Sequence, residues 1–92
     1  MSAFEGTPLE FALRDCGITA VAIAGIALEI GIEPTARHAA DLGIIPVVIE
    51  DACGAGHADA AQRSCEALRF AGDAIMTDTE AFRAALGPMG RT

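Results

Sequence analysis

The sequence predicts an α/β domain built on a parallel sheet, and three observations support this prediction. Short apolar runs rich in β-branched residues alternate with longer stretches of helical periodicity, in the order α, β, α, β, α, β, α. Glycines mark the ends of several of these segments. Hydrophobic residues make up 52% of the chain and aromatic residues only 4%, which is typical of helices packed on a sheet through small aliphatic side chains.

Local signals place each element. Thr7 is the expected N-cap of a first helix with Pro8 in its first turn, and Pro34 fits a helix only if that helix begins near Gly31. Gly72 is expected just beyond the end of a third helix, and residues 77–79 offer caps for a fourth. We therefore expect helices at residues 8–15, 28–42, 57–70 and 80–86, and strands at residues 18–24, 44–49 and 74–76.

The length of 92 residues allows one domain, residues 1–92, in which residues 87–92 are expected to fray. The run at residues 18–24 is apolar throughout, so it predicts a strand buried on both faces. Three parallel strands alone would leave two bare edges. We therefore interpret the chain as half of a larger doubly wound domain.

Composition excludes several classes of partner. The net charge of -7 disfavours nucleic acid and acidic membranes, and no apolar run approaches the roughly 20 residues that span a bilayer. Cys16, Cys53 and Cys65 have neither CxxC nor Cys/His spacing, and no pattern joins the two histidines. We therefore expect reduced thiols, a cytoplasmic protein, and neither metal nor cofactor.

Several segments together carry a resemblance to a known family. They are, in chain order, SAFEGTPLE, AVAIAGIA, EIGIEPTARHAADLG, VVIEDACGAGH and LRFAGDAIMTD. In this order and spacing they resemble the carboxyl-terminal half of the isochorismatase-like hydrolases, which include nicotinamidases and ureidoacrylate amidases. The resemblance implies a three-layer α/β/α sandwich with a six-stranded, mainly parallel sheet, of which this chain would form half, and hydrolysis of a C-N bond in an amide, carbamoyl or ureido group.

The same resemblance implies a catalytic Asp, Lys and Cys, of which this chain carries none in place. The Asp and the Lys would precede Met1. The nucleophilic Cys would stand where the segment GIALEIGIE has Gly31, and a glycine has no side chain with which to attack. The chain is therefore a candidate pseudoenzyme.

The family's backbone features do map onto this sequence. A non-proline cis peptide would fall at Ile26-Ala27, and the N-H groups near Gly31 would then point into a pocket that favours negative charge. The expected substrate-binding residues are Ile26, Ala27, Leu28, Glu29, Ile30 and Gly31. We hypothesise that a small amide or carboxylate binds there without being cleaved.

Two side chains are weak substitutes for the missing nucleophile. Glu29 could be a buried base with a raised pKa, or equally a solvated acid in the first turn of a helix. Cys53 follows the second strand and has a plausible position at the pocket. By contrast, the spacing of Glu33, Arg37 and Asp41 predicts an exposed row of ion pairs.

Three interpretations remain open. The chain is a binding, regulatory or assembly module without cysteine catalysis; or it belongs to a C-N hydrolase whose upstream half is missing and which uses a non-Cys nucleophile, such as a water activated by Asp or Glu; or it is a truncated product. The uncovered apolar strand at residues 18–24 predicts either a homo-oligomer or association with a missing amino-terminal half.

Overall fold

The computed structural model describes residues 2–86 and contains four α-helices and three strands. The helices are α1 (Leu9–Asp15), α2 (Glu33–Asp41), α3 (Ala58–Ala71) and α4 (Thr79–Leu86). The strands are β1 (Ala20–Gly25), β2 (Ile45–Cys53) and β3 (Ile75–Thr77), and a π-helical turn at Leu28–Ile32 leads directly into α2. The predicted order of helices and strands is therefore confirmed. The tail at residues 87–92 lies outside the described residues.

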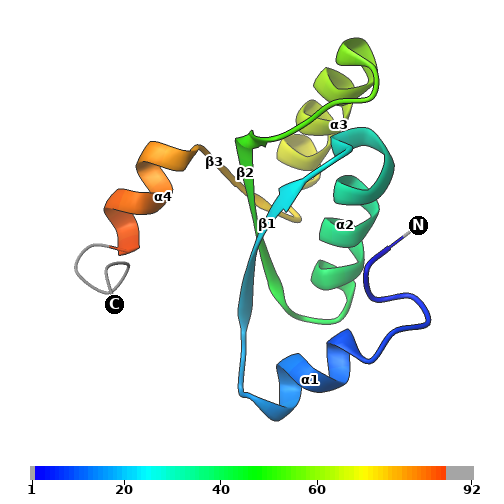
Figure 1. Cartoon of the computed structure of the whole chain (residues 1–92), viewed down its shortest axis with the longest axis vertical. Helices are drawn as coiled ribbons and strands as arrows, with labels where there is room; N and C mark the ends of the chain where they lie inside the picture. The colour runs from blue at the N-terminus through cyan, green and yellow to red at the C-terminus, as the bar shows by residue number, and fades with distance from the viewer. Residues whose placement is uncertain (1, 87–92) are drawn as a thin grey trace.

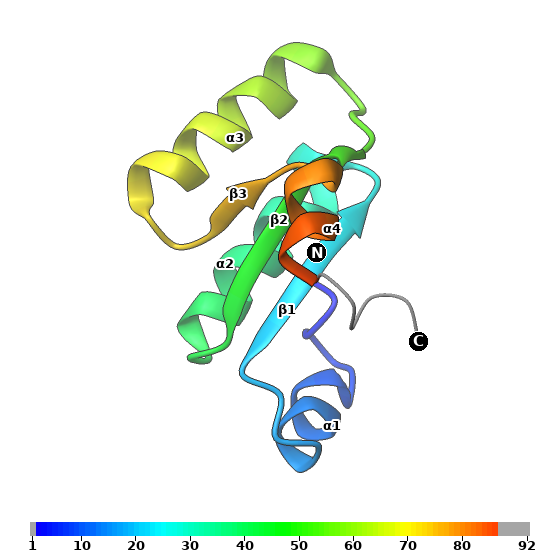
Figure 2. The same cartoon turned by 90° about the vertical axis from the view of Figure 1, so that its left-hand side faces the viewer.

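The three strands form one parallel sheet in the order β1-β2-β3, as expected for helices that alternate with strands. Ala22 pairs with Val47, and Val47 pairs with Ile75. α2 and α3 lie on one side of this sheet and α4 on the other, and the amino-terminal segment passes beside α2 (Figures 1 and 2).

The core lies between the sheet and the layer formed by α2 and α3. Val48 of β2 and Leu68 of α3 are completely buried there, together with Ala36 of α2. Residues of the π-helical turn complete this cluster, because Leu28 and Ile32 pack against the same side chains. A second, smaller cluster joins Phe4 to Ala39 and Ile44 and so attaches the amino-terminal segment to α2.

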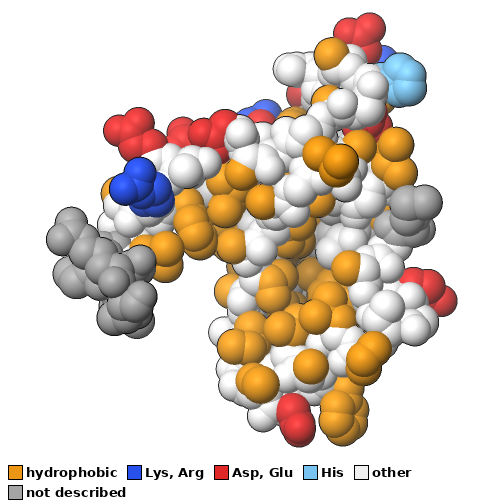
Figure 3. All heavy atoms as spheres, viewed as in Figure 1, with side chains coloured by type: hydrophobic (Ala, Val, Ile, Leu, Met, Phe, Trp, Pro, Cys, Tyr) orange, Lys and Arg blue, Asp and Glu red, His pale blue; other side chains and the backbone are white. Residues whose placement is uncertain are grey.

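The prediction that β1 is buried on both faces is wrong. Its side chains alternate, so that Val21 and Ile23 are half-buried whereas Ala22 is exposed. Ala22, Val47 and Ile75 are paired across the three strands, so they point to the same face of the sheet. On this face, which is opposite to α2 and α3, Ile75 remains 56% exposed. The reason is that α4 covers only the carboxyl end of this face, over β2. Figure 3 shows hydrophobic side chains gathered between α4 and α1.

Several boundaries also differ from the prediction. α1 begins at Leu9 with Pro8 at its N-cap, and the Thr7 hydroxyl oxygen accepts only a long hydrogen bond of 3.4 Å from the Leu9 N-H. The single helix expected at residues 28–42 is divided into the π-helical turn and α2, because Pro34 has no N-H to continue the hydrogen-bond ladder. Gly72 does end α3, with a φ of 73°.

β2 is longer than predicted and continues to Cys53. The expected strand stopped at residue 49, before Glu50 and Asp51, yet Asp51 belongs to β2 and accepts hydrogen bonds from the N-H and the hydroxyl of Thr79 in α4, both at 2.7 Å. Gly25 of β1 pairs with Cys53 after an irregularity in the register. These contacts keep a polar segment extended.

The buried core should be sensitive at Leu68. We expect Leu68→Ala to lower the free energy of unfolding by about 2–5 kcal/mol, because the cavity left behind cannot be refilled by water or neighbours. Phe70→Ala, on the same helix but 95% exposed, should change it by less than about 0.5 kcal/mol. Chemical denaturation measures both, and equal effects would contradict the assigned core.

Candidate functional site

The candidate site lies at the carboxyl end of β1. Gly25 ends the strand with a φ of 129°, a conformation that side-chain-bearing residues rarely adopt, and the Ile26-Ala27 peptide that follows is cis. The expected position of the cis peptide is thus confirmed. We call residues 26–32, which run from this peptide through the π-helical turn, the Gly31 turn.

Gly31 is half-buried and its backbone is not strained. A Cβ built on Gly31 would meet no atom within 4 Å. A cysteine side chain therefore has room at this position, and packing does not explain why glycine occupies it.

The N-H groups of the Gly31 turn converge on a single acceptor. Those of Ile30, Gly31 and Ile32 all donate to the Ala27 carbonyl, at 3.1, 3.0 and 3.2 Å. A carbonyl oxygen has two lone pairs, so it cannot form three full hydrogen bonds with these donors. A bound anion or carbonyl group would compete with Ala27 for these N-H groups.

The carboxylate of Glu29 binds the loop between β2 and α3. Its carboxylate accepts the N-H of Gly56 at 3.0 Å and also that of His57, and its side chain is only 9% exposed. The pKa of Glu29 is lowered, first by its own backbone N-H and then by that of Gly56, and these effects outweigh burial. The raised pKa expected for a general base is therefore wrong in direction, and the carboxylate is not the solvated acid of the other interpretation.

The loop at residues 54–57 is pressed against the Gly31 turn. The Gly54 N-H donates to the Gly25 carbonyl at 2.7 Å, and the Leu28 N-H donates to the Gly54 carbonyl at 2.9 Å. A Cβ at Gly54 would overlap the side chain of Ile26, and one at Gly56 would lie 3.0 Å from Glu29. A side chain at position 54 would displace Ile26, and one at position 56 would crowd the Glu29 carboxylate. The sequence analysis assigned these loop residues no role, although two glycines separated by one residue are a signal of tight packing.

Cys53 is poorly suited to replace the missing nucleophile. Its thiol donates a hydrogen bond to the Ile49 carbonyl at 3.3 Å. Burial raises the pKa of Cys53, and the charges of Glu50 and Asp51 raise it further. Less thiolate therefore forms near neutral pH, and the thiolate is the reactive species.

Several polar side chains outside the Gly31 turn have structural partners. Arg37 pairs with Glu33 at 2.9 Å, as expected, but its second partner is Asp73 at 3.5 Å and not Asp41. The Ser64 hydroxyl of α3 donates to Glu33, so this group links α2, α3 and the entry to β3. His38 lies 2.9 Å from the Ser2 hydroxyl, through its Nδ1.

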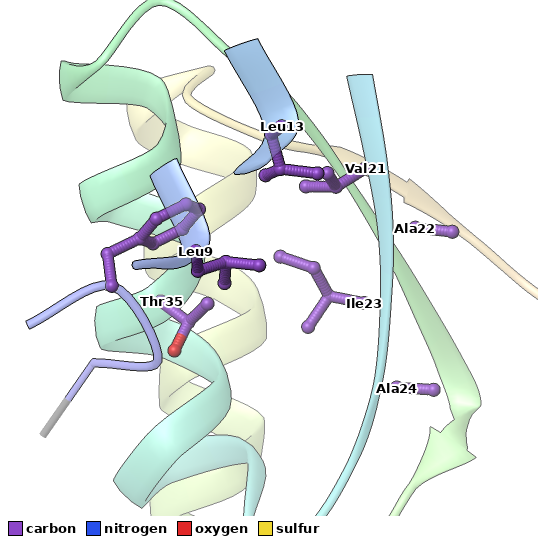
Figure 4. A pocket seen from close by; sticks show the side chains of 8 residues that line it. Leu9, Leu13, Val21, Ala22, Ile23, Ala24 and Thr35 are labelled. Carbon is purple, nitrogen blue, oxygen red and sulfur yellow. The ribbon is translucent and has the colours of Figure 1, made fainter. Parts of the chain in front are cut away.

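A separate hollow of about 260 Å³ lies beside β1, under α1. Figure 4 shows Leu9 and Leu13 of α1 facing Val21 and Ile23 of β1. The hollow is apolar and does not include Gly31. The sequence analysis missed it, and the signal was the i, i+4 spacing of the two leucines on a short helix.

A model of the isochorismatase domain matches residues 1–81 of the chain. The chain belongs to the isochorismatase family. Over 57 residues it is 49% identical to the isochorismatase family protein YecD of Escherichia coli O157:H7, an alignment that covers 62% of this chain and 30% of YecD.

Solved structures of other isochorismatase-family proteins share the fold. The nicotinamidase PncA from Bacillus subtilis aligns with a TM-score of 0.80 and 27% identity, and the pyrazinamidase of Pyrococcus horikoshii with 0.79 and 28%. Each alignment covers 84% of this chain but only 42% of the solved one. The chain thus spans less than half the length of these relatives.

The Pyrococcus horikoshii structure is a complex with zinc. Within residues 2–86 of this chain, no three His, Cys, Asp or Glu side chains lie close enough together to hold a metal ion. The described residues therefore do not fit a zinc site. Among the same residues, no helix is both long and apolar enough to cross a membrane.

The three thiols should differ in reactivity. We expect iodoacetamide at pH 8 to modify exposed Cys16 first and Cys53 at least about tenfold more slowly. Cys65 should react last, because burial and the neighbouring Glu50 raise its pKa to about 11. Peptide mass spectrometry over time measures the order. Reaction at Cys53 before Cys16 would restore Cys53 as a substitute nucleophile.

Proposed function

We propose that this chain is the carboxyl-terminal half of an isochorismatase-family domain and that its Gly31 turn binds a small amide or carboxylate without cysteine catalysis. The observation that carries the proposal is Gly31 itself. The family resemblance puts the nucleophilic thiol at this position, and here there is open space instead. Glu29 and Cys53, the two possible substitutes, have other bonding partners.

The chemistry of the ligand follows from the donors of the turn. The N-H groups of Ile30, Gly31 and Ile32 share one carbonyl, so an amide oxygen or a carboxylate is the kind of group that would offer them a further acceptor. Two solved relatives are named for nicotinamide and pyrazinamide hydrolysis, which supports aromatic amides and their acids as the first compounds to test.

A second candidate function is hydrolysis of a C-N bond by a nucleophile other than cysteine, such as a water activated by Asp or Glu. The amidase names of the solved relatives favour it, as does the preserved backbone of the turn. Neither function requires a cofactor. A cytoplasmic location fits both, because all three cysteines are free.

We also propose that the chain works in an assembly, either as a homo-oligomer or with an amino-terminal half of the domain. β1 lies at the edge of the sheet, with the apolar hollow under α1 beside it. Within residues 2–86 its one pairing partner is β2. An uncharged edge strand of this kind favours pairing with a further strand.

Calorimetry with nicotinamide, pyrazinamide and their acids tests the proposed binding. We expect heat of binding without release of ammonia. Gly31→Leu should weaken binding about tenfold or more, because its side chain fills the open space. Ala84→Leu, exposed on α4, is the matched control and should bind like the wild type.

The outcomes separate the two functions. Ammonia released by the wild-type chain would establish the hydrolase and overturn the non-catalytic proposal. Absence of heat with every compound would overturn the ligand proposal. Equal binding by Gly31→Leu and the wild type would move the ligand away from the Gly31 turn.

Light scattering tests the assembly. We expect a mass above that of one 9.4 kDa chain, because β1 offers an open edge. Ala22→Lys, which adds a charge to β1, should shift the protein toward monomer, whereas Phe70→Lys at an exposed helical position should not. A wild-type monomer at high concentration would contradict the homo-oligomer and leave the amino-terminal half as the partner.

A further inference from the structure

Glu29 joins two segments that are distant in sequence. It belongs to the Gly31 turn, whereas its hydrogen-bond donors, the N-H groups of Gly56 and His57, lie 27 and 28 residues further along the chain. Its side chain is 9% exposed, although the backbone of the two donor residues lies at the surface. Hydrogen bonds to an ionised, partly desolvated carboxylate are stronger than bonds between neutral groups.

The position of these donors explains why a charge is favourable here. His57 is the N-cap residue of α3, and its own side chain makes no capping hydrogen bond. The carboxylate of Glu29 comes from another segment and accepts the N-H groups of Gly56 and His57, just before the amino-terminal end of α3, where the helix dipole favours negative charge. Its nearest titratable neighbour among the described residues is His57, whose Nδ1 lies 3.8 Å from Oε2.

The other contacts of the loop at residues 54–57 do not replace its hydrogen bonds to the Glu29 carboxylate. Gly54 is held by backbone bonds to Gly25 and Leu28, at the beginning of the loop. At the end of the loop, the Gly56 and His57 N-H groups both bind Glu29. The loop is thus fastened to the turn at both ends, and the second fastening depends on one side chain.

We propose that Glu29 is a positioning residue of the candidate site, whose carboxylate clamps the loop at residues 54–57 to the Gly31 turn and so keeps the Gly31 N-H in place for a ligand. Glu29 lies two residues from Gly31, inside the same turn of helix. Loss of the clamp therefore frees the turn as well as the loop. This inference rests on the ligand site proposed above, and it assigns Glu29 no contact with the ligand.

Hydrogen exchange without any ligand tests the clamp directly. In the wild type at pH 7 we expect the amides of Gly31, Gly56 and His57 to be protected. Glu29→Gln keeps the shape of the side chain but removes its charge, and it should lower protection at all three amides by about tenfold or more. Glu66→Gln, an exposed position on α3, is the control and should leave all three unchanged.

The pH profile distinguishes positioning from simple stabilisation. The folded-state pKa of Glu29 is lowered, so its contribution is complete above the ordinary value of 4.5 and is lost as pH falls through the lowered pKa. Protection factors at Gly31 should therefore fall toward acid pH in the wild type and stay flat in Glu29→Gln. Loss of protection at Gly56 and His57 with Gly31 unchanged would overturn the proposal, because Glu29 would then hold only the loop before α3.

A nicotinamide titration separates this inference from the proposed function. If the wild type binds, Glu29→Gln should bind about tenfold more weakly while Glu66→Gln binds normally. Equal affinity of Glu29→Gln and the wild type would contradict the positioning role even if exchange changes. If the wild type does not bind, the ligand proposal fails, and the exchange data alone decide whether the clamp holds the Gly31 turn.

Discussion

The carboxyl ends of β1 and β2 are joined by backbone hydrogen bonds in which Gly54 donates to Gly25 and accepts from Leu28. This junction decides where the chain leaves the sheet. It sets the start of the Gly31 turn and brings the loop before α3 against that turn. The Glu29 carboxylate thereby lies beside the amino-terminal end of α3. It also orients the π-helical turn so that Leu28 and Ile32 enter the core with Leu68. Core, turn and loop are consequently parts of one structure.

The order of helices and strands could be predicted from the conformational preferences of residues that are close together in the chain. Pro34 determined where a helix had to begin, and Gly72 determined where one had to end. The alternation of apolar strands with helices predicted the parallel sheet. These features depend on residues close in sequence, so the sequence carries them directly.

Features that depend on distant partners were not predictable in the same way. Glu50 and Asp51 look like the end of a strand, yet pairing of Cys53 with Gly25 keeps the backbone extended. One of the two interpretations of Glu29 gave it a raised pKa, because a buried carboxylate loses hydration. Three backbone N-H groups reverse that effect, and two of them come from a loop more than 25 residues away. The position of the site was therefore predictable, while the partners of its side chains were not.

The uneven cover of the sheet has a consequence for the polypeptide in a cell. One face of the sheet is packed against α2 and α3, while Ile45 and Ile75 remain about half exposed on the other. Chains that present such surfaces are recognised by chaperones and proteases or cluster with one another. Chains made in excess of the partner that covers this face would be degraded first. The abundance of the polypeptide would therefore follow the abundance of that partner and not the rate of its own translation.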